Sequence, residues 1–376
     1  MLKILFINNN LEMGGIQKAL INMLKNISGK YDITLMLFSE TGTMLNEVPK
    51  EIKVVSPNKY YRILGIGKEE LKHTPILFVI KAFFVILSRV IGKRRALKLF
   101  GIFQKKISGF DVVISCSHLT NYYRFENGCA EFVLDKSLTK KKICFVHCDY
   151  KESGFSSIHN NEAYLQYDRI ICVSESVKNR LLTEIPELNK KVCTIRNFYD
   201  FDIKERALEE PYIYNEKFLN IIIVARLSPE KGIARAIEAL KKSCRRDILL
   251  HIVGDGPSEH ELKELTKKSE IENQIIFYGK QENPYRYMAR ADYLLLPSFH
   301  EAAPIVYDEA HILNIPIIST MLLSSKEMLN QNDIICENTE EGLINTFNAI
   351  SKKEFYVRNY ISNDIQIELF RKIVEG

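Results

Sequence analysis

The sequence lacks the patterns that mark several classes of protein. Its eight cysteines include no C-x-x-C pair, so neither a zinc ribbon nor a thioredoxin-like motif is indicated. Cys116, Cys144 and Cys172 fall in apparent strands, as expected of buried free thiols in a reducing compartment. The apolar run at residues 1–7 is too short for a signal peptide, and we expect it to form a first strand. No internal repeat or low-complexity segment is visible.

Two common nucleotide-binding motifs are also missing. There is no P-loop, and the turn at residues 8–15 lacks the three-glycine fingerprint of dinucleotide-binding proteins. A second turn, Gly254-Asp255-Gly256, is followed by Pro257 and so lacks the third glycine. A dinucleotide-binding enzyme is therefore not predicted.

The patterns that could hold a metal are weak. Cys144, His147 and Cys148 have no second ligand pair. Asp200 and Asp202 have the spacing of a metal-binding acid pair, but they lie in a polar stretch that is better explained as a linker turn. We expect no metal and no cofactor.

The chain does contain a regular alternation of apolar strands and helices. Its 376 residues exceed the usual size of one core, and 46% hydrophobic with 26% charged residues is ordinary for a soluble globular protein. Strands are expected at 3–8, 33–38, 52–55, 111–116, 142–147, 168–173, 192–196, 219–225, 248–253, 275–278, 292–296 and 316–319. This order predicts an α/β fold with two doubly wound parallel sheets.

The composition also suggests where the domains divide. The stretch from Asp200 to Pro211 is polar and charged, as an interdomain linker would be. We therefore expect a first domain at 1–200 and a second at 201–354. A C-terminal helix at about 355–376 could pack back on the first domain.

The most informative segment is 297–310, where an apolar strand gives way to a helix. Pro304 suits a first helical position, and the free amides of Ile305 and Val306 could then hold a phosphate. Glu309 would lean back toward the helix mouth and accept from the hydroxyls of a ribose. Glu301 lies in the loop before the helix, close to whatever the phosphate carries. Acids at a helix start are also common because they favour its dipole, so this segment alone does not decide the function.

A second segment, 221–232, provides cations. Its strand is apolar throughout, as a parallel strand covered on both faces should be. Arg226 at the strand end and Lys231 five residues later are expected to converge above the sheet edge, where ligands of open α/β sheets bind. One guanidinium fork and one point charge suit a diphosphate.

These two segments together resemble the retaining glycosyltransferases of family 4. The matching motifs are R-L-S-P-E-K-G at 226–232 and E-x7-E at 301–309. Four shorter segments, which also match in order, are 13–15, 145–149, 173–176 and 253–257. The resemblance covers about residues 1–350 and implies two Rossmann-like domains facing a cleft, the glycosyltransferase B type.

The resemblance also implies roles for individual residues. Arg226 and Lys231 would stabilise the leaving diphosphate, and Glu301 would hold sugar hydroxyls. His147 would line the donor-sugar pocket; the alternative for this residue is a strand-end histidine satisfied by a backbone carbonyl. The remaining donor-binding positions that it implies are Gly14, Gly15, Gly254, Ala303, Pro304, Ile305, Val306 and Glu309. The implied reaction retains configuration, needs no metal and uses a nucleoside-diphosphate sugar, with UDP as the favoured nucleotide.

The sequence departs from the family pattern at three positions. The family usually has glycine where Ala225 stands, and glycine plus a large apolar residue where Ala302 and Ala303 stand. An added methyl group at a tight turn can restrict the backbone or narrow a sugar pocket. The departures concern the identity of the donor more than the class of reaction.

Residues 75–107 suggest a membrane partner. They are strongly apolar, and from Lys81 through Lys106 there are eight basic residues and no acidic one. A run of about seventeen residues with a lysine inside it is unfavourable as a transmembrane helix. A basic, apolar helix pair suits the surface of an anionic membrane, although the same helices could simply cover the first sheet.

A lipid-linked or glycan acceptor would place the chain in bacterial surface polysaccharide synthesis, such as that of capsule, exopolysaccharide or lipopolysaccharide. We then expect a cytoplasmic enzyme, peripheral on the inner face of the cell membrane. Nucleic acid is a poor partner, because the basic segment lacks interleaved aromatic residues. Two alternatives stay open: a nucleotide-sugar epimerase of the same fold, and a catalytically silent subunit that supports a transferase.

Overall fold

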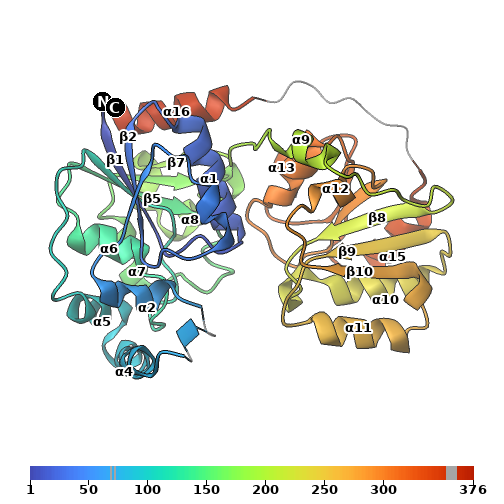
Figure 1. Cartoon of the computed structure of the whole chain (residues 1–376), viewed down its shortest axis with the longest axis horizontal. Helices are drawn as coiled ribbons and strands as arrows, with labels where there is room; N and C mark the ends of the chain where they lie inside the picture. Colours follow the sequence, from blue (N-terminus) through green and yellow to red (C-terminus); the bar gives the residue numbers. More distant parts are fainter. Residues whose placement is uncertain (68–69, 72, 353–361) are drawn as a thin grey trace. The chain divides into compact units, whose positions relative to one another are not determined.

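In the computed structural model, residues 1–67, 70–71, 73–352 and 362–376 are described, and they form two compact units (Figure 1). The first unit comprises Met1–Phe198 and Asn363–Gly376, and the second comprises Tyr199–Ser362. Each unit is an open parallel sheet with helices on both faces. This confirms the predicted fold class of two doubly wound α/β units.

The sheet of the first unit has seven strands, in the order β3-β2-β1-β4-β5-β6-β7. These strands are β1 Lys3–Asn8, β2 Asp32–Leu37, β3 Lys53–Val55, β4 Val112–Ser115, β5 Lys141–Val146, β6 Arg169–Cys172 and β7 Val192–Thr194. The helices are α1 Gly15–Ile27, α2 Arg62–Gly65, α4 Pro75–Ile91, α5 Lys93–Phe100, α6 Cys129–Lys136, α7 Ile158–Tyr164, α8 Glu175–Glu184 and α16 Asp364–Glu375.

The sheet of the second unit has six strands, in the order β10-β9-β8-β11-β12-β13. These strands are β8 Leu219–Val224, β9 Ile248–Val253, β10 Ile275–Gly279, β11 Tyr293–Leu296, β12 Ile317–Thr320 and β13 Ile334–Cys336. The helices are α9 Ile203–Leu208, α10 Ile233–Ser243, α11 Glu259–Lys268, α12 Tyr285–Met288, α13 Ile305–Ile312, α14 Ser325–Met328 and α15 Glu340–Ala349.

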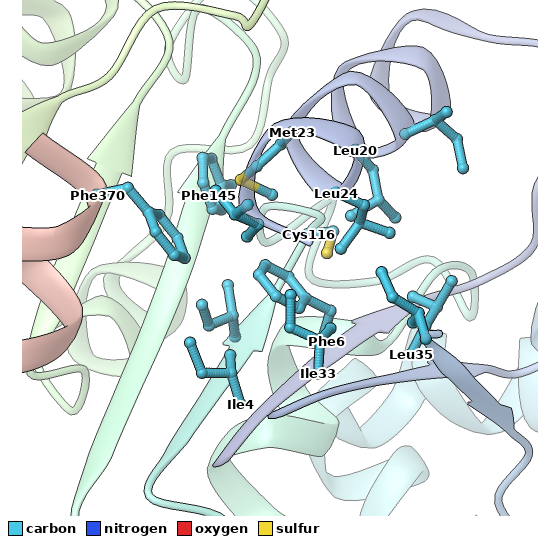
Figure 2. Close-up of a cluster of buried hydrophobic side chains, with 14 of the residues drawn as sticks. Ile4, Phe6, Leu20, Met23, Leu24, Ile33, Leu35, Cys116, Phe145 and Phe370 are labelled. Carbon is cyan, nitrogen blue, oxygen red and sulfur yellow. The ribbon is translucent and has the colours of Figure 1, made fainter. Parts of the chain in front are cut away.

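The core of the first unit joins both ends of the chain (Figure 2). Phe370 of α16 stacks on Phe6 of β1 with ring centroids 6.2 Å apart, and it meets Tyr31 edge-on. Lys141 donates from Nζ to the last carbonyls of α16, those of Ile373 and Val374. The C-terminal helix therefore belongs to the first unit, and the N- and C-termini lie side by side (Figure 1). Residues 355–361 of the expected C-terminal helix lie outside the described residues.

The expected linker at 200–211 is wrong in its centre, because residues 203–208 form α9. Ile203 and Ala207 are buried in a core of the second unit, so this polar segment packs through its few apolar side chains. Asp200 accepts from the amide of Asp202 at 3.2 Å, which describes a turn before the helix.

The predicted helix pair in 75–107 is present as α4 and α5, separated at Gly92, whose φ of +85° favours glycine. In α4 only Ser88 is buried. Among the described residues, no helix combines the length and the apolar character that crossing a bilayer would require.

Candidate functional site

The predicted donor residues of the second unit gather at the carboxyl edge of its sheet. In this sheet β8 pairs with β9 on one side and with β11 on the other. The strand order therefore reverses between β8 and β11, which is where open α/β sheets bind ligands. The loops that follow these two strands carry Arg226 with Lys231 and Glu301 with Pro304, respectively.

Lys231 and Glu301 are in direct contact. Lys231 Nζ lies 2.5 Å from Glu301 Oε1, and both side chains are largely buried, with 24% and 17% exposed. Ser298 also donates to this oxygen, at 3.0 Å. Two of the predicted catalytic residues therefore form one polar cluster. Because Glu301 already balances the Lys231 charge, an anionic ligand would have to share that lysine.

Arg226 is held differently. Its side chain is 70% exposed and pairs with Glu230 at 3.3 Å, while Ser228 donates to the same Glu230 oxygen at 2.5 Å. Partial burial of Glu230 acts to raise its pKa, but the hydrogen bonds from Ser228 and Arg226 outweigh it and lower that pKa. Arg226 and Lys231 thus pair with different carboxylates. An exposed pair such as Arg226–Glu230 is weak and can open for a ligand.

Pro304 occupies the N-cap of α13 rather than the predicted first helical position, which is a correction of one residue. Its ψ of +118° is extended, and the helix begins at Ile305. The first amides of a helix have no intrahelical acceptor, and the N-cap residue Pro304 makes no side-chain cap. Ile305 and Val306 therefore still present the amides that we expected to meet a phosphate.

Glu309 is buried, with 5% exposed, and accepts from the hydroxyl of Tyr285 at 3.3 Å. Tyr285 lies on α12 and is 1% exposed. The carboxylate is thus held from the side of the core. Its predicted contact with a ribose stays a prediction.

Gly254 is required by backbone packing. Its φ is +141°, and a side chain there would lie 1.9 Å from the carbonyl oxygen of Ala225. Its amide donates to Gly279 at 2.9 Å. The glycine turn after β9 therefore supports the loop after β8, while a donor contact by Gly254 stays a prediction. Ala302 is buried at 8% exposure, and Ala303 is partly buried.

In the first unit, His147 follows β5 directly. Its ring stacks on Phe145 with centroids 5.7 Å apart, and it lines a small pocket with Cys116, Met23 and Arg196. Burial lowers the pKa of His147 to about 4, against the opposing effect of the hydrogen bond that the imidazole donates to the backbone carbonyl of Cys116. The imidazole is therefore neutral near pH 7, and it can act as a dipole without adding a charge.

Gly14 and Gly15 lie at the start of α1. Gly14 is the N-cap with an extended φ of −173°, a conformation that any residue adopts. A side chain at Gly15 would meet nothing within 4 Å. The backbone conformation of this turn does not itself demand glycine, although a side chain at Gly14 would lie 2.6 Å from Gln17 Oε1. Donor contacts by Gly14 and Gly15 stay predictions.

Two residues that the sequence did not single out lie close to these sites. Arg235 of α10 is 9% exposed and contacts the loop before Glu301. His118, after β4, is 8% exposed and stacks on Phe155, and its Nδ1 has no hydrogen-bond partner among the described residues. No sequence motif distinguishes either of them, because their positions depend on strand order. In the part of the chain that the structure describes, no three His, Cys, Asp or Glu side chains form a group that could hold a metal.

Comparison with known proteins identifies the second unit. The family model described as glycosyl transferases group 1 matches residues 205–366. The second unit is thus similar to that family over nearly its whole length. The match contains Arg226, Lys231, Glu301 and Glu309, so the predicted donor site lies within the glycosyl transferase domain.

Individual relatives agree with the family. The chain is 30% identical over 179 residues to N-acetyl-alpha-D-glucosaminyl L-malate synthase of Bacillus anthracis, covering 46% of this chain and 47% of that one. It is 28% identical over 209 residues to the O-antigen biosynthesis glycosyltransferase WbnH of Escherichia coli, covering 52% and 58%. The chain spans about half the length of the curated relatives that it matches.

Solved structures extend the likeness of fold over both units. The crystal structure of Anabaena Alr3699/HepE in complex with UDP and glucose superposes with a TM-score of 0.63 at 16% identity, covering 93% of this chain and 89% of that one. The fold is thus that of the B-type glycosyltransferases, as the sequence predicts.

Proposed function

We propose that the chain moves a sugar from a nucleoside-diphosphate donor, with UDP the favoured nucleotide, to a hydroxyl group of a glycan or lipid-linked glycan acceptor. The observation that carries this proposal is the Lys231–Glu301 contact at the switch point of a group 1 glycosyl transferase domain. The relatives support a role in bacterial surface polysaccharide synthesis, because one of them is an O-antigen biosynthesis glycosyltransferase. The UDP complex of a structural neighbour supports the choice of nucleotide.

In the proposed reaction, Lys231, Arg226 and the amides of Ile305 and Val306 stabilise the leaving diphosphate as the glycosidic bond lengthens. Removing one such preorganised donor typically costs ~2.7–4 kcal/mol. The acceptor hydroxyl attacks from the face of the leaving group, so configuration is retained, and a phosphate oxygen takes its proton. Glu301 orients sugar hydroxyls, and the neutral His147 lines the sugar site. No metal is needed for these steps.

The test is turnover of a panel of nucleoside-diphosphate sugars, followed by release of the nucleoside diphosphate with and without a glycan acceptor. Lys231→Ala should lower the rate by about 10²–10³-fold, because it removes a cation from the leaving group. Arg226→Ala should lower it in the same direction.

Lys242→Ala is the matched control. Lys242 also pairs with a glutamate, Glu340, on the same unit, but both side chains are well exposed, and Lys242 lies at the C-terminal end of α10. Near-normal rates for both Lys231→Ala and Arg226→Ala would contradict the assignment. Donor conversion without nucleotide release would favour the epimerase, and nucleotide binding without turnover would favour the silent subunit.

We further propose that α4 lies on an anionic membrane surface. Its exposed apolar residues recur every three or four positions and so share one helical face. These residues, with exposed fractions of 59–76%, are Ile76, Val79, Phe83, Ile86 and Val90. The adjoining residues Leu99, Ile102 and Phe103 are exposed as well. Such a stripe is suited to insertion among lipid headgroups.

The charges around this stripe complement anionic lipid, although fewer take part than the sequence suggests. Lys93 is fully buried, Arg94 pairs with Asp135, and Lys81 donates to a backbone carbonyl. Lys98 is exposed but also lies 3.6 Å from Asp135. The other exposed basic residues are Arg89, Arg95, Lys105 and Lys106. Each can add about 1 kcal/mol of attraction to an anionic surface. This attachment would place the enzyme on the inner face of the cell membrane.

Vesicle flotation tests the membrane proposal. The variant Ile76→Gln/Phe83→Gln/Ile86→Gln should no longer float with vesicles that contain anionic lipid, whereas wild type should. Leu208→Gln/Ile213→Gln, which changes equally exposed apolar residues of the second unit, should float like wild type. Equal flotation of all three proteins would contradict the proposal, as would a stripe that is covered by a second copy of the chain in solution.

A further inference from the structure

Arg235, on the first turn of α10, is a buried cation without an acid. Its side chain is 9% exposed, and among the residues that the structure describes it has no carboxylate partner. Burial lowers the pKa of its guanidinium, but an arginine still keeps its proton at neutral pH. A buried charge is costly unless its donors are satisfied.

Backbone carbonyls of the loop after β11 satisfy this charge. Arg235 donates from Nε to Pro297 O at 2.9 Å, and from Nη2 to Pro297 O at 2.5 Å and to Ser298 O at 2.8 Å. Its Nη1 reaches the carbonyl of Asn338, after β13, at 3.3 Å. The guanidinium also lies 3.9 Å from the ring centroid of Phe299. One side chain thus fixes three consecutive residues of the loop.

The same loop carries the proposed donor site. Ser298, whose carbonyl Arg235 binds, donates from its hydroxyl to Glu301, and Glu301 in turn binds Lys231. Gly232 allows the close approach, since a side chain there would lie 2.0 Å from Pro297 O. A continuous line of contacts therefore runs from Arg235 through Ser298 to the Lys231–Glu301 pair.

We propose that Arg235 is a positioning residue that holds the 297–301 loop so that Glu301 and Lys231 meet where the donor diphosphate binds. The claim that Arg235 holds the 297–301 loop stands on the contacts alone. The claim that this helps to bind the donor rests on the proposed function. Arg235 acts through backbone carbonyls and does not itself touch the substrate. Its planar fork, which spans two neighbouring carbonyls, cannot be replaced by a point charge without loss.

Two measurements on the full chain test this inference. The first is hydrogen exchange of peptides covering 297–303, which needs no ligand. Arg235→Gln should speed exchange there, including at the Phe299 amide, which donates to Glu230 at 2.9 Å. The second is the affinity for UDP. Arg235→Gln should weaken it by about tenfold to a hundredfold, because a displaced loop misplaces the groups that it carries. Arg235→Lys should recover part of this loss.

The matched control is Arg245→Gln. Arg245 also donates to two backbone carbonyls, those of Phe347 and Ile350, but it precedes β9 and so lies at the opposite edge of the sheet. The Arg245→Gln variant should be less stable than wild type, but its affinity for UDP and its hydrogen exchange at 297–303 should not change. A double-mutant cycle with Lys231→Ala separates positioning from general destabilisation. The effect of Arg235→Gln on affinity should shrink in the Lys231→Ala background, because both act on one cluster.

Unchanged exchange at 297–303 in Arg235→Gln would overturn the positioning role, whatever the protein binds. Faster exchange with unchanged UDP affinity, or additive effects in the cycle, would overturn its link to the donor. A wild-type chain that binds no nucleoside diphosphate and transfers no sugar would instead contradict the proposed function, and the exchange result would still decide whether Arg235 holds the loop.

Discussion

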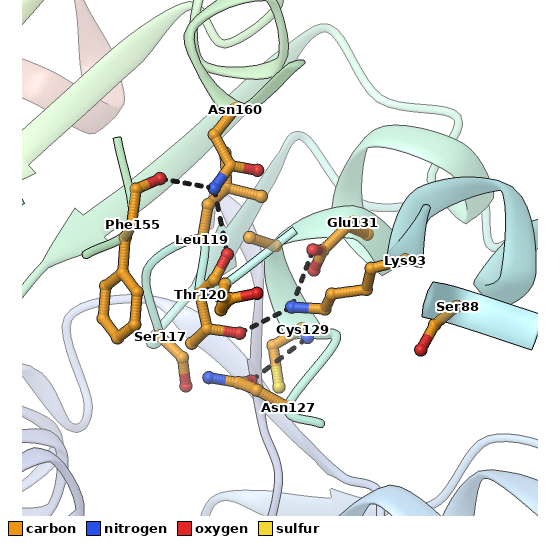
Figure 3. Close-up of polar contacts among 12 residues, drawn as sticks. Ser88, Lys93, Ser117, Leu119, Thr120, Asn127, Cys129, Glu131, Phe155 and Asn160 are labelled. Carbon is orange, nitrogen blue, oxygen red and sulfur yellow. Dashed lines mark hydrogen bonds and ion pairs between the residues drawn. The ribbon is translucent and has the colours of Figure 1, made fainter. Parts of the chain in front are cut away.

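Lys93 illustrates how a single residue can change role between sequence and structure. In the sequence it is one of eight basic residues in a segment without acids. In the structure it is fully buried, 2.8 Å from Glu131, and it donates to the Thr120 hydroxyl at 2.7 Å (Figure 3). Its backbone amide also donates to Tyr122. Lys93 therefore connects the start of α5 to α6 and to the loop after β4.

Removing one partner of this pair should be costly. Glu131→Gln leaves a buried ammonium group without its counter-charge, and we expect it to lower the free energy of unfolding of the first unit by about 3–5 kcal/mol. The double variant Lys93→Met/Glu131→Leu removes both charges. Its free energy of unfolding should fall by less than that of Glu131→Gln alone. Urea unfolding followed by circular dichroism measures both. A double variant as unstable as the single one would contradict the argument.

The site residues divide by how local their signals are. Helix-start chemistry at 304–306 and the cations at 226 and 231 could be recognised from their neighbours in sequence. The ion pair of Lys231 with Glu301 could not, because these residues lie 70 positions apart and meet only through the adjacency of β8 and β11. Arg235 had no signal at all. A buried arginine on an amphipathic helix looks like any exposed one until the opposing loop is known.

At the scale of elements, most strands could be predicted, and one was missed. The twelve expected strands are present with bounds within about two residues, because each is a short apolar run between turns. β13, Ile334–Cys336, was missed because its three apolar residues are flanked on both sides by polar and acidic ones. α9 was interpreted as a linker because most of its residues are polar or charged. Its apolar residues Ile203 and Ala207 pack into a core of the second unit, and this packing cannot be recognised from the local sequence.

The C-terminal helix offers a test at this scale. Phe370 of α16 is fully buried between Phe6 and Tyr31. Phe370→Ala should therefore lower the free energy of unfolding by about 3–5 kcal/mol through the cavity that it leaves. Leu369→Ala, at a 36% exposed neighbour on the same helix, should cost much less. Urea unfolding of the two variants gives the comparison. Equal losses would show that α16 is not anchored through Phe370.

At the scale of the whole molecule, both units bury neutral histidines. Burial lowers the pKa of His118 to about 3, with the charges of His147 and Lys93 adding to the effect, and it lowers the pKa of His251 to about 4. Burial also lowers the pKa of His147 to about 4. In an unfolded chain, histidine titrates near 6.5. Between about pH 4 and 6.5 the unfolded state therefore binds more protons than the folded state.

Stability should consequently fall as the pH drops below about 6.5, by up to about 1.4 kcal/mol per pH unit for each of these histidines. Urea midpoints measured from pH 7.5 to 5.0 give this slope. His118→Phe, which keeps the stack on Phe155, should flatten it, because one buried imidazole no longer excludes a proton. His260→Gln, at an exposed position, should leave the slope unchanged. A slope that is identical in His118→Phe and wild type would contradict the prediction.

The sequence by itself determined the alternation of strands and helices, the two parallel sheets and the residue types at the strand ends, because these depend on apolar periodicity and turn chemistry within a few residues. Tertiary structure alone decided which charges meet. Lys231 pairs with Glu301, and Arg235 donates to the carbonyls of Pro297 and Ser298. Lys93 is buried against Glu131 and so does not contribute to the basic surface. Side-chain pairing follows the order of strands in a sheet, and that order is a property of the assembled core rather than of any local stretch of chain.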